Sequence, residues 1–419
     1  MDNFTHTLAA LLVAEAAIAF VPASMPSVSA RSRRILLIAS AITNNLPDAD
    51  FIYAGITPGK LGYLLHHRGH THTLPFALLL GLSCFWLCRW WLERKPPASA
   101  DSSRALERRL LLGLCVLGPF LHIGLDATNN YGVHPFWPVY SGWFHGDGVF
   151  VVEPWLWVVT LPALTASART VIGRGVLIVT LIAAVGICWA YPRLPAPIAV
   201  ALTVVALTAG LGAFQLTPTQ RLRGALVAWL IVTGVFFAGS RLARSTLRAA
   251  LAVEPGAGSR SALDVVITPL VGNPFCYAAI GVEVSDSSYR LSVARVSPFP
   301  WFFDARHCPS DREGTTARLG SAGLPSARVA WYGRWEGSLE GLRKLSERCD
   351  AAAFLRFART PYWTERPSGG YVIGDLRYDN SPELDFAEME LDPVEMRCPP
   401  NVPGWTPPRQ DLLERAAGR

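Results

Sequence analysis

The most reactive stretch of the chain is a run of histidines next to an apolar segment. Four histidines stand within seven residues, in the sequence HHRGHTH: His66, His67, His70 and His72. Imidazole nitrogen is a standard ligand of zinc-like ions, and so dense a run in the interior of a chain favours a metal site over a tag. Not all four need bind the ion, because some could orient other ligands or donate to a phosphate. Arg68, inside the run, carries the guanidinium that pairs with phosphate.

Further candidate ligands lie before and after this run. His6 stands in FTHTLAA, and two acids stand in NNLPDAD. His122 and Asp126 are four residues apart, so on a helix both side chains leave the same face one turn apart. Acids in a turn also serve as helix caps, and that alternative stays open for each of them. The predicted metal ligands are His6, Asp48, Asp50, His67, His70, His72, His122 and Asp126.

The segments that position these residues are apolar enough to lie in lipid. Of 419 residues 51% are hydrophobic and 17% are charged, which is more apolar than a soluble protein usually is. A cluster of polar groups is costly in such a setting and therefore marks a functional site. The candidate membrane spans are residues 5–22, 35–47, 74–92, 110–127, 154–168, 171–190, 196–214 and 222–240. The second span is short, and a re-entrant or buried helix is an alternative for it.

The basic residues predict which ends of these spans face the cytoplasm. They flank alternate connections, whereas the loop 127–154 has neither Lys nor Arg. These basic residues are Arg31, Arg33, Arg34, Arg89, Arg94, Lys95, Arg104, Arg108, Arg109, Arg169, Arg174, Arg221 and Arg223. The exceptions to the alternation are Arg241, Arg244 and Arg248, which follow the last span. By the positive-inside rule the basic connections are cytoplasmic and the 127–154 loop is external, which brings all the candidate ligands to the outer face.

The chain after residue 255 has the composition of a soluble domain. ALDVVITPL, YAAIGVEVS, YRLSVARVS and GGYVIGDLRYD favour strands, and LEGLRKLSERC and AAAFLRFART favour helices, so we expect an α+β domain. Four of the eight cysteines lie in it, an even number that permits two disulfides outside the cytoplasm: Cys276, Cys308, Cys349 and Cys398. The net charge of +6 is modest and lies mostly beside the apolar runs, so no nucleic-acid partner is expected. The head of the chain shows no cleavable signal peptide.

Taken in order, four motifs resemble the YdjM/YbcI-type family of bacterial inner-membrane metal-dependent hydrolases, over residues 1–155. The motifs are THTLAALLVAEA, NNLPDAD, HHRGHTHTLPFALLLG and LHIGLDATNNYGVHPFWP. The resemblance implies a relation to zinc-dependent phospholipases C and S1/P1 nucleases, which hold three zinc ions in a helical core. The implied ligands are His6, Asp48 or Asp50, one or two of His67, His70 and His72, and His122 with Asp126. Those enzymes also bind metal through a processed N-terminal residue and through a later His/acid pair. In this chain the candidates for the later pair are His145 and Glu153. We therefore favour a centre of two metal ions over a centre of three.

These observations predict a mainly α, polytopic membrane bundle, and the resemblance implies that it has a phospholipase C/P1 nuclease-like helical core. The expected parts are a metal-dependent hydrolase domain (1–155), additional transmembrane helices (156–250) and the soluble α+β domain (255–419). We expect a hydrolase in the bacterial inner membrane that acts on phosphoesters, including lipid headgroups, with two or three divalent ions such as zinc. In the expected chemistry Asp48 or Asp50 bridges ions or orients the attacking water, and Arg68 binds phosphate. The alternatives are a metal-binding or transport protein, in which the intramembrane Glu15 would take part, and a scaffold that anchors the soluble domain.

Overall fold

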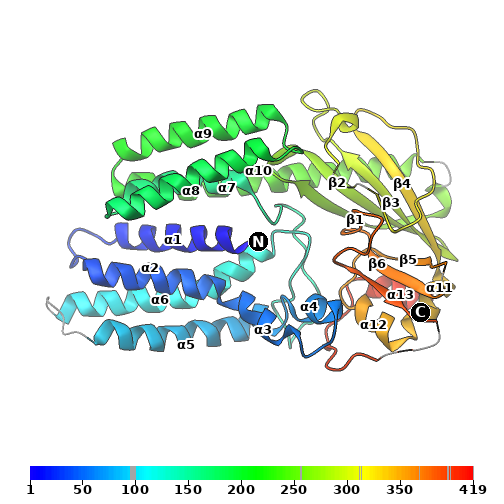
Figure 1. Cartoon of the computed structure of the whole chain (residues 1–419), viewed down its shortest axis with the longest axis horizontal. Coiled ribbons are helices and arrows are strands. Elements are labelled where there is room, and N and C mark those ends of the chain that lie inside the picture. The colour runs from blue at the N-terminus through cyan, green and yellow to red at the C-terminus, as the bar shows by residue number, and fades with distance from the viewer. Residues whose placement is uncertain are drawn as a thin grey trace.

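The computed structural model has two parts, a bundle of roughly parallel helices and a β-rich C-terminal domain at one end of it (Figure 1). The structure describes residues 1–94, 101–254, 257–310, 312, 314–367, 369–393, 396 and 398–418. Lys95 and the predicted domain boundary at residue 255 lie outside these residues. The N-terminus lies in the middle of the molecule, where the two parts meet.

Each of the eight apolar runs forms most of a helix or lies within one. The bundle consists of α1 (Asn3–Ala19), α2 (Ala30–Asn45), α5 (Leu74–Glu93), α6 (Asp101–Asp126), α7 (Pro154–Ser167), α8 (Val171–Ala190), α9 (Ala196–Gln215) and α10 (Pro218–Ala252). Among the described residues, five of these helices are long and apolar enough to cross a membrane: α5, α6, α8, α9 and α10. The other three, α1, α2 and α7, have 17, 16 and 14 residues. Glu15 is buried inside the bundle against Arg33, as its place in an apolar helix predicts.

The last helix of the bundle continues well beyond its predicted end near residue 240. α10 has 35 residues, and its C-terminal third packs Ala243, Leu247 and Leu251 against the sheet of the C-terminal domain. These three side chains are four residues apart and form one apolar stripe. The predicted span 222–240 therefore lies within a longer helix, and Arg241, Arg244 and Arg248 lie on its continuation rather than in a connection. Arg244 lies on this extension, where it pairs with Asp147 and Asp264.

The C-terminal domain is α+β, as predicted. Its first sheet has the antiparallel order β1 (Ser261–Leu270), β2 (Asn273–Val284), β3 (Ser288–Val296) and β4 (Val329–Ser338). A second antiparallel sheet contains β5 (Pro361–Glu365), β6 (Tyr371–Asp375) and β7 (Glu388–Leu391). The helices are α11 (Leu339–Ser346), α12 (Cys349–Leu355) and α13 (Gln410–Ala416), and the predicted helix over AAAFLRFART ends early, at Leu355. Two disulfides, Cys276–Cys308 and Cys349–Cys398, close this domain, whereas the four cysteines of the bundle are free.

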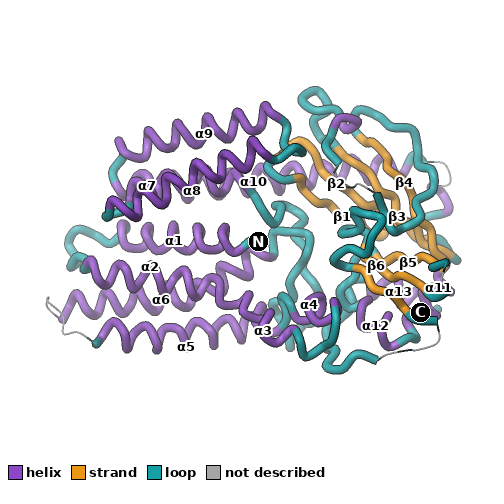
Figure 2. Tube along the Cα trace, viewed as in Figure 1, coloured by secondary structure: helices purple, strands orange, loops and turns teal. Residues whose placement is uncertain are grey.

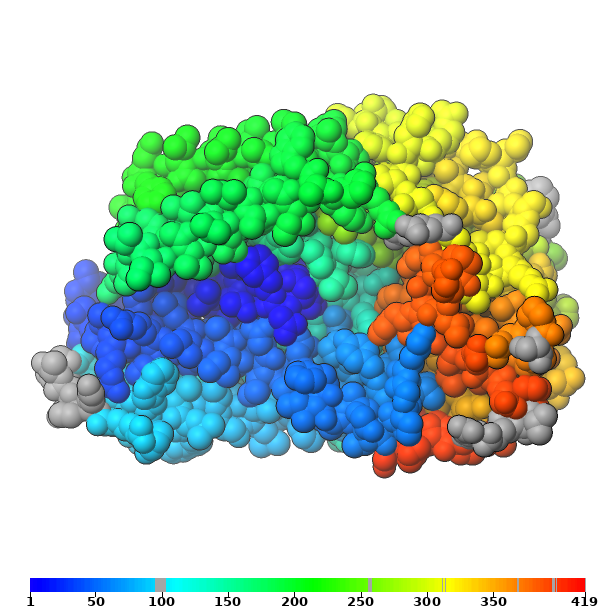
Figure 3. All heavy atoms as spheres, viewed as in Figure 1, coloured from blue at the N-terminus to red at the C-terminus, as the bar shows by residue number. Residues whose placement is uncertain are grey.

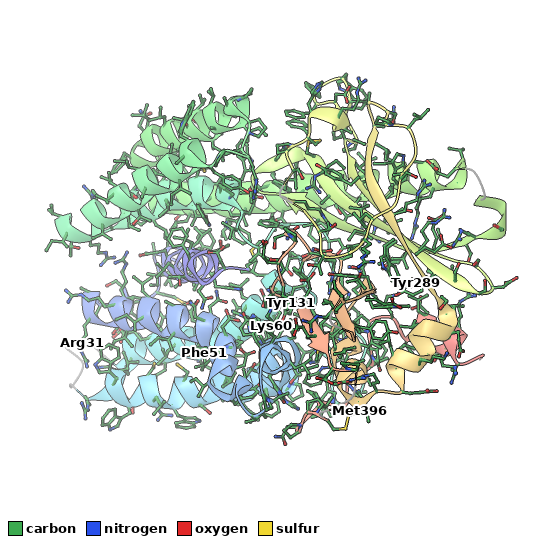
Figure 4. The ribbon with its side chains drawn as sticks, turned by 45° about the vertical axis from the view of Figure 1, so that its right-hand side comes forward. Arg31, Phe51, Lys60, Tyr131, Tyr289 and Met396 are labelled. Carbon is green, nitrogen blue, oxygen red and sulfur yellow. A yellow bond between two sulfur atoms is a disulfide. The ribbon has the colours of Figure 1, made fainter. Side chains whose placement is uncertain are left out.

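The connection between α6 and α7 lies between the bundle and the C-terminal domain (Figure 2). Its Asp147 is fully buried and receives two hydrogen bonds from Arg359, of 2.7 and 3.1 Å, and Arg359 also pairs with Asp264 of β1. Lys60, at the start of α4 (Lys60–His66), donates to the carbonyl of Leu384 at 3.1 Å. Figure 4 labels Lys60 and Tyr131 in this region, where the bundle meets the C-terminal domain. The domain is therefore held to the same end of the bundle at which α1 begins and α6 ends.

Candidate metal centre

Four elements bring the predicted ligands to one end of the bundle. The first turns of α1 carry His6, and the last turn of α6 carries His122 and Asp126. The 3₁₀ turn η1 (Leu46–Asp50), which contains Pro47 in its first turn, follows α2 and carries both predicted acids. A second 3₁₀ turn, η2 (His70–His72), carries His72 into α5. Short turns at helix ends thus place polar groups beside the apolar bundle rather than within it.

Asp48, His72, His122 and Asp126 form a group whose ligand atoms all lie within 4.8 Å of one another. The Nε2 atoms of His72 and His122 are 3.1 Å apart, and each lies near the same two carboxylates. The Nε2–carboxylate distances are 3.5 Å (His72–Asp48), 3.2 Å (His72–Asp126), 3.3 Å (His122–Asp48) and 3.4 Å (His122–Asp126). Two imidazole nitrogens and two carboxylate oxygens directed at one point are a donor set that suits zinc and similar ions.

The opposite ring nitrogens of both histidines are held by oxygen atoms. Nδ1 of His122 lies 2.6 Å from the carbonyl oxygen of Asn44, at the end of α2. Nδ1 of His72 lies 3.3 Å from a carboxylate oxygen of Asp50. An acceptor at Nδ1 places the proton there and leaves Nε2 as a free lone pair, which is the arrangement found around metal-bound histidines.

Burial separates Asp48 from the other three members of the group. His72, His122 and Asp126 are completely buried, whereas the side chain of Asp48 is 12% exposed. Asp48 is therefore the accessible edge of the group.

His6 lies against the group without belonging to its four closest members. Its ring stacks on His122 at 3.8 Å between centroids, and its Nε2 is 3.4 Å from Asp126. Neither ring nitrogen has a hydrogen-bond partner although the residue is fully buried. An unsatisfied buried polar group costs about 1–3 kcal/mol, which a bound cation would relieve. The amino group of Met1 also contacts the Asp126 carboxylate.

Asp50, His67 and Arg68 surround the group. Asp50 accepts hydrogen bonds from the Arg68 backbone N–H at 2.8 Å and the Thr71 hydroxyl at 3.2 Å, and it lies 3.0 Å from Nδ1 of His67. The Arg68 guanidinium is 3.0 Å from the Asp126 carboxylate and donates to Asn129 at 2.9 Å. Both oxygens of Asp50 are thus occupied by neighbouring protein groups, which suits a residue that orients ligands.

The structure does not bring the remaining candidates into the group. Nε2 of His66 is 2.8 Å from the Thr57 hydroxyl, and the ring of His70 lies between Trp137 and Trp405. His145 fills the space left by Gly132, whose φ of +90° favours glycine. Glu153 caps the start of α7 by accepting a hydrogen bond from its backbone.

Sequence reasoning missed Asn44 and Asn129 as neighbours of the group. A backbone carbonyl such as that of Asn44 carries no residue-type signal, so no pattern could reveal it. Asn129 stands in the ATNNY sequence directly after Asp126, and its closeness to a predicted ligand was the available signal.

A cavity of about 680 Å³ opens beside the accessible edge of the group. Its polar lining includes Asp2, Asn45, Asp48, His67 and Arg68, and its apolar lining includes Ile42, Leu46, Phe51, Tyr131 and Phe386. Phe386 belongs to the C-terminal domain, so both parts of the molecule contribute to this cavity. A molecule bound there would reach the group at Asp48.

Fold and site together define a helical membrane protein with a candidate metal centre at one end of its bundle. Residues 1–196 match the family model described as YdjM inner membrane protein, and this segment contains every member of the centre. The match extends beyond the 155 residues that the motifs cover, through α8 to the first residue of α9. No curated protein and no solved structure matches the chain. The family match and the five candidate spans support a membrane location.

Proposed function

We propose that the protein is a membrane-bound, metal-dependent hydrolase that acts on phosphoesters, lipid headgroups included, at the outer face of the bacterial inner membrane. The observation that carries this proposal is the buried group Asp48, His72, His122 and Asp126, which has one accessible edge on a cavity. The donor set favours zinc, which when bound would lower the pKa of a water molecule and polarise a phosphoryl oxygen. The relation to zinc-dependent phospholipases C and P1 nucleases is part of this proposal.

The residues around the group have distinct roles in the proposed reaction. Asp48 lies at the cavity and would bind the ion and orient the attacking water. Arg68 also lines the cavity, and its guanidinium would pair with a phosphate oxygen of the substrate. His6, with both ring nitrogens unpartnered, would complete the donor set. Asp50 and His67, which lie 3.0 Å apart, would orient the ligands from the Nδ1 side of His72.

Two features support the outer orientation. The two disulfides lie in the domain that packs on the site end of the bundle, and disulfides persist outside the cytoplasm. The predicted cytoplasmic arginines, such as Arg31 and Arg221, lie at the opposite ends of the helices. Figure 4 shows Arg31 at the end of the bundle remote from the C-terminal domain.

One observation favours hydrolysis over transport of the metal. A transported ion needs acids along the membrane, but Glu15, buried in α1, is already paired with Arg33. The polar groups suited to metal therefore gather at one end of the bundle.

The test is hydrolysis of bis-p-nitrophenyl phosphate and of phosphatidylglycerol by the purified protein in detergent, before and after chelation. We expect activity to disappear with the metal, to return with zinc, and to fall at least tenfold in Asp48→Asn and Arg68→Lys. Arg290→Lys is the matched control, because Arg290 pairs with the exposed Glu336 in the C-terminal sheet. Activity that survives chelation, or that is equal in Asp48→Asn and the control, would contradict the proposal.

A further inference from the structure

A groove runs along α1 from the cavity of the candidate metal centre toward the other end of the bundle. In Figure 3, α1 (dark blue) lies recessed between α2 (blue) and α8 (green). The 680 Å³ cavity includes Asn3 of α1 and Ile42 of α2. A second cavity, of about 290 Å³, includes Leu11 of α1, Leu37 of α2 and Leu177 of α8. The two cavities thus lie on the same face of α1.

The floor and walls of the groove are suited to an acyl chain. The floor is the α1 face that carries Asn3, Thr7 and Leu11, which are four residues apart and at least partly exposed. The Thr7 hydroxyl donates a hydrogen bond to the Asn3 carbonyl at 2.8 Å. The floor therefore does not present this hydroxyl unpaired to an acyl chain. On α2, Ile38 and Ile42 are 43% and 48% exposed. These isoleucines continue the apolar lining of the metal-side cavity onto the outer surface of the bundle.

Charged groups bound this apolar stretch at both ends. At the metal end the cavity is lined by Asp48 and by the buried Arg68. At the other end Glu15 pairs with Arg33, and both residues line the second cavity. From Asn3 to Glu15 the helix rises about 18 Å, at 1.5 Å per residue. One leaflet of a bilayer has a hydrocarbon thickness of about 15 Å, half of the 30 Å core.

We infer that the groove along α1 holds one acyl chain of a membrane phospholipid whose phosphate lies beside Arg68 in the 680 Å³ cavity. The length of the groove and its apolar stretch match one acyl chain of the outer leaflet, and Arg68 supplies the cationic group for the phosphate. This inference rests on the proposed function, because it names the substrate class of the same site. The lipid reaches the metal centre sideways from the bilayer, between α2 and α8, and not through the aqueous phase.

The test uses purified protein in nanodiscs of phosphatidylethanolamine and phosphatidylglycerol with a trace of phosphatidylglycerol that carries a diazirine in its acyl chain. We expect light-induced crosslinks on the peptides that contain Thr7 to Leu11 and Leu37 to Ile42. Leu11→Trp fills the groove and should reduce these crosslinks at least fivefold. Ile182→Trp is the matched control, since Ile182 is 66% exposed on α8 and does not line either cavity.

The same variants separate lipid binding in the groove from hydrolysis at the metal centre. We expect Leu11→Trp to lower the ratio of phosphatidylglycerol hydrolysis to bis-p-nitrophenyl phosphate hydrolysis at least tenfold, with bound metal unchanged. Crosslinks at the groove from a wild-type protein that hydrolyses neither compound would support the groove and contradict the proposed function. Crosslinks spread over the exposed helix faces, or equal crosslinking in Leu11→Trp and Ile182→Trp, would overturn the groove whatever the activity.

Discussion

Replacing Asp50 by Asn tests how the centre is held, because this residue contacts His72, a member of the four-residue group, without belonging to the group itself. Its carboxylate lies 3.3 Å from Nδ1 of His72 and 3.0 Å from Nδ1 of His67, and it accepts from the Arg68 backbone N–H at 2.8 Å. Asparagine keeps the size and one acceptor oxygen but turns the other into a donor. His72 then loses the acceptor that keeps its Nδ1 protonated, and the tautomer that binds metal through Nε2 becomes less populated.

The expected loss of zinc affinity follows from the role of Asp50, which orients a ligand without binding the ion itself. Loss of a partner that orients a metal-bound histidine lowers metal affinity about 10- to 100-fold, which corresponds to about 1.4–2.8 kcal/mol. The assay is titration of metal-free protein with zinc against a chelating dye. Asp379→Asn is the control, because Asp379 is equally buried and accepts from the backbone of Thr316 and Ala317 in the C-terminal domain. Zinc affinity of Asp50→Asn within about threefold of both the wild type and this control would refute the reasoning.

Four further predictions concern the C-terminal domain. Arg359→Met removes one of the two arginines that pair with the buried Asp147, leaving Arg244, and should destabilise the protein by about 1.5–3 kcal/mol, seen as a lower Tm; an unchanged Tm would contradict the coupling of domain and bundle. Burial would raise the pKa of Asp264, but Arg359, Arg409 and Arg244 outweigh it and hold the pKa below its usual value. The stabilisation by Asp264 is then complete above about pH 4 and is lost on further acidification, so Asp264→Asn should show a shallower fall of Tm with acid than the wild type. The two disulfides close segments of 32 and 49 residues, and reduction of each should lower the free energy of unfolding by about 4 kcal/mol. The unfolded protein should react with a thiol reagent at four cysteines before reduction and at eight after it. A reporter fused after residue 254 should be active as alkaline phosphatase, whereas a fluorescent green fluorescent protein fusion there would refute the outer orientation.

Residue type and order were sufficient to find the four members of the group that could hold a metal ion. His122 and Asp126 share a helix face by their spacing, and Asp48 and His72 stand in turns next to apolar helices. The division between ligand and orienting residue was beyond the sequence, because Asp48 and Asp50 are separated by one residue and differ only in which neighbours they meet. The same holds for His70 and His72, since a single 3₁₀ turn directs one ring toward Trp137 and the other toward His122.

The fold was predictable where the local residue pattern determines the structure of a single helix or strand. Apolar runs gave the bundle helices, and alternating β-branched residues gave the strands. The extension of α10 was missed because average hydropathy falls after residue 240, although Ala243, Leu247 and Leu251 keep an apolar stripe at helical spacing. The pairing of the four cysteines was undetermined, because four cysteines allow three pairings and spacing does not select one. The contribution of Phe386 to the cavity depends on contacts between parts of the chain more than 300 residues apart, which no local pattern encodes.

The most direct test of the central claim is the metal content of the purified protein, measured by inductively coupled plasma mass spectrometry after reconstitution with zinc. The account predicts at least one zinc ion per wild-type chain, loss of that ion in His122→Ala and in Asp126→Ala, and retention in His307→Ala, whose histidine lies in the C-terminal domain. X-ray absorption of the bound zinc should show nitrogen and oxygen neighbours and no sulfur, since the group contains no cysteine. A wild-type protein that stays free of zinc, or variants that hold as much zinc as the wild type, would contradict the account.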